Sequence, residues 1–299
     1  MKLLLFLIAT AFAKEGFRTD FASAPAAVQK WEERTFLVSS GDRPLGTAFL
    51  VHKDEKGLHF LTASHVALRC HGEGRCSLHR RAVWRRPPGD MIVRSELSVD
   101  VPEKSIHFFV PKGKSWERTG AAATDLAYMR TVDFPGSPQA DFSEMGPFSL
   151  PTFPAEVKIE RAHYILGYPS LHQRPSLRQS EEAKSLKIRW SEGESFIKRR
   201  YVSAGFMEPT MITRRFELKS NADSLGGNSG GPVVDESGKL LGLLYGGPAY
   251  DEYRDYEDFY SWIVPADYAR VFLKAVFIGH SAAEAMCSRG GHKDRNYCK

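Results

Sequence analysis

One serine of this chain lies in a short glycine-rich segment. The sequence GGNSGGP covers residues 226–232, with Ser229 at its centre and an apolar run directly after it. Glycines let a backbone approach a ligand closely and adopt conformations that other residues avoid. A serine in such a turn can present its hydroxyl beside two backbone N–H groups, as an acyl-transfer nucleophile and its oxyanion hole require. Glycine-rich turns with serine are also common in all-β proteins, so the meaning of this turn depends on the residues before it.

Two polar residues precede this serine, each beside a strand-like run. Residues 58–63 read as a strand that leads to His65, and Asp125 opens a second apolar run. A histidine after a strand is commonly a turn or core residue, and an aspartate before a strand is commonly a turn residue. The order His65, Asp125, Ser229 is nevertheless that of the chymotrypsin type of triad and differs from the subtilisin and α/β-hydrolase orders. The three residues together therefore predict one catalytic unit.

These segments resemble the motifs of chymotrypsin-fold (trypsin-like) serine peptidases, in the style of secreted bacterial members. The resemblance covers roughly residues 30–275. It implies an all-β fold of two six-stranded antiparallel β-barrels with a C-terminal helix. The matching segments are TASH at 62–65, DLA at 125–127, GNSGGP at 227–232 and, more weakly, LGYP at 166–169.

The resemblance also implies a role for each site residue. Ser229 would be the nucleophile, His65 its general base and Asp125 the group that orients the imidazole. The N–H groups of Gly227 and Ser229 would form the oxyanion hole. Such a site needs no metal or organic cofactor. The implied function is a secreted serine endopeptidase that cuts proteins or peptides through an acyl-enzyme intermediate.

Two positions depart from the family pattern. In animal digestive members a freshly cut N-terminus pairs with an aspartate just before the nucleophile, whereas this chain has Asn228 there. We therefore expect no activating cleavage beyond removal of a signal peptide. The serine that usually supports the buried acid is replaced by Tyr245, followed by Gly246 and Gly247. These three residues are expected to line the substrate cleft.

Asp223 is a candidate for substrate selection. It lies six residues before Ser229, the spacing at which trypsin-like members carry the acid at the base of the primary specificity pocket. A buried carboxylate there would bind Arg or Lys through charge-assisted hydrogen bonds, and the acidic stretch 250–258 would add negative potential. Relatives with other preferences, including glutamate-specific ones, also carry aspartate at this spacing, so both interpretations stay open.

The first residues read as an export signal. A basic start is followed by an apolar core over residues 3–8 and a small-residue cleavage site ending at Ala13. This run is much shorter than a membrane span requires, so we expect a secreted or periplasmic protein without a membrane span. The formal net charge of +5 is too small to indicate a nucleic-acid partner. We expect a monomer.

The four cysteines are expected to form disulfides in an oxidising compartment. Sequence proximity favours Cys70 with Cys76 and Cys287 with Cys298. The alternative is a zinc site, because cysteines and histidines cluster over residues 70–79. That spacing fits no common zinc motif, so disulfides are favoured.

The chain divides by composition and by the resemblance into six parts. The expected parts are a signal peptide (1–13), a lead-in segment (14–30), a first barrel (31–140), a linker (141–154), a second barrel with the C-terminal helix (155–278) and a disulfide-tied tail (279–299). Residues 171–200 are charged and read as a solvated loop or, alternatively, as an exosite for an acidic partner.

Two other functions fit the same fold. One is a catalytically inactive peptide-binding module, and the other is a secreted serine esterase.

Overall fold

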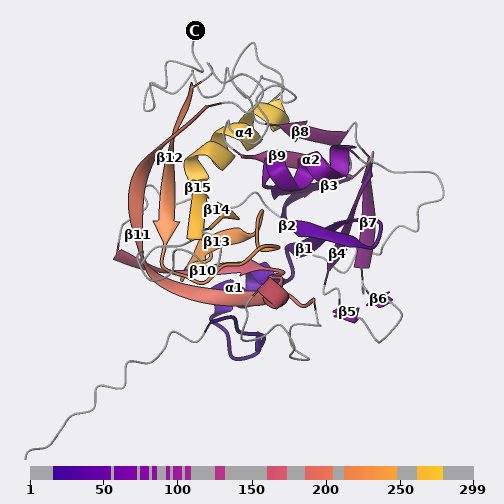
Figure 1. Cartoon of the computed structure of the whole chain (residues 1–299), viewed down its shortest axis with the longest axis horizontal. Helices are drawn as coiled ribbons and strands as arrows, with labels where there is room; N and C mark the ends of the chain where they lie inside the picture. Colours follow the sequence, from indigo (N-terminus) through magenta and orange to yellow (C-terminus); the bar gives the residue numbers. More distant parts are fainter. Residues whose placement is uncertain are drawn as a thin grey trace, which may run out of the picture.

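Antiparallel strands make up most of the part of the chain that the computed structural model describes (Figure 1). They form two large sheets, one in each half of the sequence, and a separate strand pair. The described residues are 16–54, 57–72, 75–80, 83–85, 92–94, 97–102, 105–108, 125–131, 160–173, 186–204, 212–247 and 261–278. The expected signal peptide, linker, acidic stretch 250–258 and C-terminal tail lie outside them.

The N-terminal sheet is built on a meander of three long strands, which pair in sequence order. It has the order β7-β4-β1-β2-β3-β9-β8, and β5 with β6 forms the small separate sheet. The strands are β1 (Thr35–Ser40), β2 (Arg43–Asp54), β3 (Gly57–Thr62), β4 (Arg75–Arg80), β5 (Val83–Arg85), β6 (Ile92–Arg94), β7 (Leu97–Pro102), β8 (Ile106–Phe108) and β9 (Ala127–Arg130).

The C-terminal sheet closes on itself as a barrel with the order β10-β11-β12-β15-β14-β13. A helix, α4 (Ala266–Ile278), follows the last strand and contacts β14 and β15. The strands are β10 (Glu160–Gly167), β11 (Arg189–Ala204), β12 (Ile212–Ser220), β13 (Pro232–Asp235), β14 (Leu240–Gly246) and β15 (Ser261–Pro265), and a short 3₁₀ helix, η4 (Leu171–Gln173), follows β10.

The expected all-β fold with two barrels and a C-terminal helix is confirmed, with two differences of detail. The nearly closed N-terminal sheet has seven strands in the described part of the chain, where six were expected. Residues 189–200, read from their charge as part of a loop, belong to β11, because pairing with β10 and β12 satisfies their backbone. The part of that charged segment at residues 174–185 lies outside the described residues.

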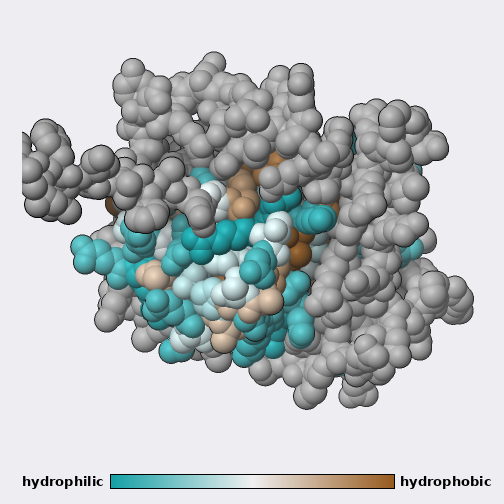
Figure 2. Space-filling view, turned by 90° about the horizontal axis from the view of Figure 1, so that it is seen from below, coloured by the Kyte–Doolittle hydropathy of each residue, from teal (hydrophilic) through white to brown (hydrophobic). Residues whose placement is uncertain are grey.

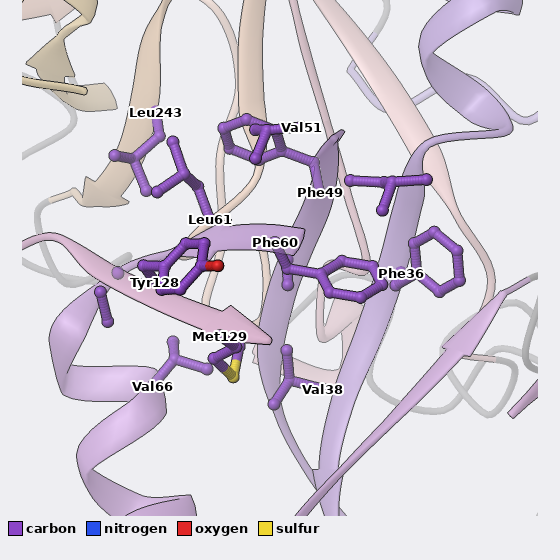
Figure 3. Packing of buried hydrophobic residues seen from close by; sticks show 14 of the residues in the cluster. Phe36, Val38, Phe49, Val51, Phe60, Leu61, Val66, Tyr128, Met129 and Leu243 are labelled. Atoms are coloured by element: carbon purple, nitrogen blue, oxygen red, sulfur yellow. The ribbon is translucent and has the colours of Figure 1, made fainter. Parts of the chain in front are cut away.

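One continuous apolar core joins the two sheets. Figure 3 shows Phe36, Phe49, Phe60 and Tyr128 of the N-terminal sheet in the same cluster as Leu243 of the second barrel. The rings of Phe36 and Phe60 meet edge to face at 5.1 Å, an arrangement that aromatic quadrupoles favour. The two sheets therefore pack against each other through a shared core.

The segment before the first sheet lies against the second one. Residues 16–25 lead into α1 (Ala26–Glu32), which contacts β10 and β13. Arg18 and Trp190 of β11 exchange two backbone hydrogen bonds of 2.8 and 3.0 Å. The indole of Trp31 donates to the carbonyl of Gly238 at 3.0 Å. The chain therefore crosses from the second barrel into the first before β1 begins.

The described surface is largely polar. On the face shown in Figure 2 the described residues are mainly hydrophilic, with a few apolar side chains among them. Within the described ranges, Ile197 is the large apolar side chain that is exposed, at 40%. None of the helices in the described ranges is both long enough and apolar enough to span a membrane.

Candidate active site

Strand pairing brings the candidate histidine and aspartate together. His65 is the second residue of α2 (Ser64–Gly72), which begins directly after β3. Asp125 stands just before β9, and β9 runs antiparallel to β3 with Thr62 opposite Ala127. The end of one strand therefore lies beside the beginning of the other. His65 Nδ1 and Asp125 Oδ2 are 2.9 Å apart.

Asp125 is held in place by several hydrogen bonds. Its side chain is 4% exposed. Its Oδ1 atom accepts the hydroxyl of Ser64 at 2.8 Å and the backbone N–H of His65 at 3.0 Å. Bonds of this kind compensate a buried carboxylate for lost hydration. Its φ of +54° is uncommon for a residue with a side chain. These hydrogen bonds hold the carboxylate in the orientation in which it bonds the imidazole of His65.

Ser64 is a site residue that the sequence analysis missed. Tyr245 stands where the family usually has the serine that supports the buried acid, so the sequence did not show which residue supports Asp125. The hydroxyl of Tyr245 donates to Glu217. The support for Asp125 comes instead from Ser64, which is 4% exposed. The available signal was a serine directly before His65 in the TASH segment.

Glycines allow the serine-bearing turn to lie against the first sheet. Gly227 and Gly230 have φ values of +93° and +89°, which residues with a side chain rarely adopt. A Cβ atom on Gly230 would lie 2.0 Å from the carbonyl of Thr47 and 3.0 Å from the backbone nitrogen of Ala63. The neighbour of Ser229 therefore contacts the segment that leads into His65.

The Ser229 hydroxyl has a long hydrogen bond. It donates to the carbonyl of Tyr245 at 3.4 Å, near the upper limit for a hydrogen bond between oxygens. Within the described ranges no hydrogen bond joins Ser229 to His65. Such catalytic contacts are often long or misaligned without substrate. The hydroxyl of Ser229 is therefore only weakly held by the turn.

The backbone N–H groups of Gly227 and Ser229 point away from the hydrogen-bonded carbonyls that precede them in the turn. The Gly226 carbonyl accepts the Ser170 N–H at 2.7 Å, and the Asn228 carbonyl accepts the Gly231 N–H at 2.8 Å. In a trans peptide the N–H lies opposite the carbonyl, so these bonds orient the N–H groups of Gly227 and Ser229. Neither N–H donates to an acceptor within the described residues. The turn therefore offers two donors that could bind an anionic oxygen.

His65 differs from two other histidines in having an accessible ring nitrogen. Its side chain is 33% exposed, and its Nε2 has no hydrogen bond in the described part of the chain. His59 uses both nitrogens, for Asp54 at 2.8 Å and Tyr128 at 2.5 Å, and burial lowers its pKa. His163 is buried, with both nitrogens bonded. A general base needs an available nitrogen, so His65 suits that role better than these two.

The candidate substrate-binding residues lie on both sides of the turn. Asp223 follows β12, is 8% exposed, and its carbonyl accepts the hydroxyl of Ser191 at 2.6 Å. Tyr245 and Gly246 end β14, and Gly247 follows them. Residues 248–260, which include the acidic stretch, lie outside the described residues.

One of the two expected disulfides is present. Cys70 of α2 and Cys76 of β4 are bonded, with their Cα atoms 4.9 Å apart. The bond engages the two thiols that the alternative zinc site would need. Cys287 and Cys298 lie outside the described residues. The described part of the chain contains no group of three or more His, Cys, Asp or Glu side chains placed to hold a metal ion.

Comparison with known proteins places the chain in a family. No curated protein matches it. Among solved structures, an inactive serine-to-alanine mutant of Rv3671c from M. tuberculosis has 14% identity and a TM-score of 0.49, over 87% of this chain and 94% of that one. The active form of the Rv3671c protease from M. tuberculosis has 17% identity and a TM-score of 0.47, over 86% and 85%. The family model of the trypsin-like peptidase domain matches residues 46–243, more than half of the chain. This protein belongs to the trypsin-like peptidase family.

Proposed function

We propose that this peptidase is a serine endopeptidase with Ser229 as nucleophile, His65 as general base and Asp125 as the residue that orients the base. One observation carries the proposal: His65 Nδ1 is bonded to a buried carboxylate at 2.9 Å, while its Nε2 is unbonded within the described residues. This is the arrangement by which an imidazole accepts a proton from a serine hydroxyl.

The reaction would proceed in two halves. Ser229 Oγ attacks the carbonyl carbon of the scissile bond and passes its proton to His65 Nε2. The tetrahedral intermediate then collapses, and His65 returns the proton to the leaving amine, which gives an acyl-enzyme. Water, activated by the same imidazole, releases the acid product and restores the serine. Asp125 stabilises the imidazolium formed in each half.

The oxyanion formed in each half would be bound by the N–H groups of Gly227 and Ser229. Both donors belong to a turn whose carbonyls are already bonded, so little reorganisation is needed when charge develops. Loss of one such donor typically costs about 3 kcal/mol of transition-state stabilisation.

Active-site labelling tests the proposal directly. A fluorophosphonate probe should form one covalent adduct, which peptide mapping should locate at Ser229. The Ser229→Ala variant should give no adduct, and His65→Ala should react far more slowly because its serine is no longer activated. A wild-type protein that folds but does not react would support an inactive peptide-binding module. Rapid turnover of esters with no turnover of peptides would support the esterase alternative.

We further propose that Asp223 selects Arg or Lys before the cleaved bond. The residue is nearly buried and lies six residues before the nucleophile. Among peptides that differ only in Arg, Glu, Phe or Val at that position, the Arg peptide should have the highest kcat/KM. Asp223→Ser and the isosteric Asp223→Asn should lower that value about 100-fold or more, because a buried substrate charge would lose its partner. An unchanged profile in both variants, or better turnover of the Glu peptide by wild type, would contradict this assignment.

The remaining parts of the proposal concern location and organisation. We propose export with signal cleavage near Ala13, which the Cys70–Cys76 disulfide supports, because disulfides persist in oxidising compartments. Division into the parts 31–140, 141–154 and 155–278 also stays a proposal, as does a monomeric state.

A further inference from the structure

Thr47 of β2 uses all its polar groups at the junction between the first sheet and the serine-bearing turn. The residue is fully buried. Its N–H donates to the carbonyl of Ser229 at 2.8 Å, and its hydroxyl donates to the carbonyl of Gly227 at 2.7 Å. Its own carbonyl accepts the hydroxyl of Thr62 at 2.6 Å. One residue of the first sheet thus holds the turn on both sides of Asn228.

The Thr47 hydroxyl also accepts a hydrogen bond from the second barrel. The backbone N–H of Tyr168, which follows β10, donates to it at 3.1 Å. The hydroxyl therefore links the Tyr168 N–H of the second barrel to the Gly227 carbonyl of the turn. A Cβ atom on Gly167 would lie 2.9 Å from this oxygen and 3.1 Å from the Cα atom of Asn228. The hydroxyl oxygen is therefore packed closely against the backbone of the second barrel.

The turn has no comparable support from its own buried side chain. Asn228 is fully buried, and neither its amide nitrogen nor its amide oxygen has a hydrogen-bond partner within the described residues. The geometry of the turn therefore depends on bonds to its backbone. The bonded Gly226 and Asn228 carbonyls share peptide planes with the Gly227 and Ser229 N–H groups. Thr47 binds the Gly227 and Ser229 carbonyls, which belong to the two peptide planes on either side of the one that carries the Ser229 N–H, and so limits rotation of the turn there.

We propose that Thr47 is a positioning residue that holds the oxyanion-binding turn in its active geometry. The inference rests on the proposed function, because it gives the Gly227 and Ser229 N–H groups a role in the reaction. Its hydroxyl acts through the backbone of Gly227 and does not touch the substrate. The hydroxyl should therefore affect the transition state, in which the oxyanion forms, more than the binding of substrate.

The test uses two replacements that separate the hydroxyl from the shape of the side chain. Thr47→Val keeps the branched shape and removes the hydroxyl, and Thr47→Ser keeps the hydroxyl. We expect Thr47→Val to lower kcat for an amide substrate by about 10- to 100-fold with KM changed less than about threefold. Thr47→Ser should keep kcat within about threefold of wild type. A peptide boronic acid, which forms a tetrahedral adduct, should lose affinity in parallel with kcat.

Thr35 provides a matched control. It is also a fully buried threonine of the first sheet, and its hydroxyl donates to the carbonyl of Trp31 at 2.7 Å. Thr35→Val should lower the melting temperature and leave kcat near the wild-type value. Should Thr47→Val fail to fold, Thr47→Ala is compared with Thr47→Ser below the melting temperature of both, because these two variants differ only in the hydroxyl.

Two outcomes would overturn the inference. One is a folded Thr47→Val enzyme with wild-type kcat and boronate affinity. The other is an equal loss of kcat in Thr47→Ser, which would assign the effect to packing and not to the hydroxyl. Failure of the proposed function is separate and is recognised from Ser229→Ala: if that variant keeps wild-type activity, the nucleophile is wrong.

Discussion

Replacing Ser229 or His65 with alanine is expected to lower kcat by about 10⁴- to 10⁶-fold on a peptide substrate. Ser229 would form the covalent bond, and His65 would accept its proton, so neither can act without the other. For the same reason the double variant should be little slower than either single variant. Asp125→Asn should also cost about 10⁴-fold, because the amide favours the wrong tautomer of the imidazole.

These rates should be measured on proteins of verified fold and compared with KM. KM should change little, because the triad acts on the transition state. Contamination by wild-type enzyme is controlled by titrating active sites with the fluorophosphonate probe. A Ser229→Ala preparation that keeps a tenth of the wild-type activity, after this correction, would contradict the assignment.

Trp31→Ala is expected to destabilise the protein by about 3–5 kcal/mol, the usual cost of removing a buried aromatic side chain. Trp31 is 1% exposed, meets the ring of Phe49 edge to face at 5.6 Å and donates its indole N–H to Gly238. The variant would leave a cavity in the shared core and an unbonded carbonyl on the second barrel. The melting temperature should fall by about 10 °C.

Thermal and urea unfolding, followed by circular dichroism, measure this loss. The control is Ile197→Ala, which removes an exposed apolar side chain of β11 and should change the free energy of unfolding by less than about 0.5 kcal/mol. A loss below 1 kcal/mol for Trp31→Ala would show that the helix before β1 is not a structural tie between the barrels.

The parts of the fold that could be predicted from the sequence are those indicated by the types of neighbouring residues. The apolar run at 58–63 was expected to be a strand and lies largely in β3, and the GGNSGGP turn has positive φ at Gly227 and Gly230. Both depend on residues close together in the chain. The order of His65, Asp125 and Ser229 along the chain then indicated which polar residues beside strands form the candidate triad.

The parts that the sequence did not predict depend on contacts between distant residues. Thr47 and Gly227 are separated by 180 positions, and Ser64 and Asp125 by 61. Serine and threonine are common, and only the strand register shows which of them meet a buried carboxylate or carbonyl. Part of strand β11 was missed because its charged residues do not show the alternation of apolar and polar residues that indicates a strand. In the closed barrel its backbone pairs with a neighbouring strand on each side, β10 and β12.

The contact of the lead-in segment with the second barrel has a consequence for the time at which activity can begin. The indole–carbonyl bond from Trp31 to Gly238 closes a loop of 207 residues, and the two barrels share one core. Contacts of such sequence separation form late and slowly, because the entropy of a long loop is lost before they contribute. During synthesis on a ribosome, the half that carries His65 emerges before the half that carries Ser229. A partly synthesised chain that lacks Ser229 therefore cannot assemble the candidate site, which can form only after the second barrel has been made and has packed against the first.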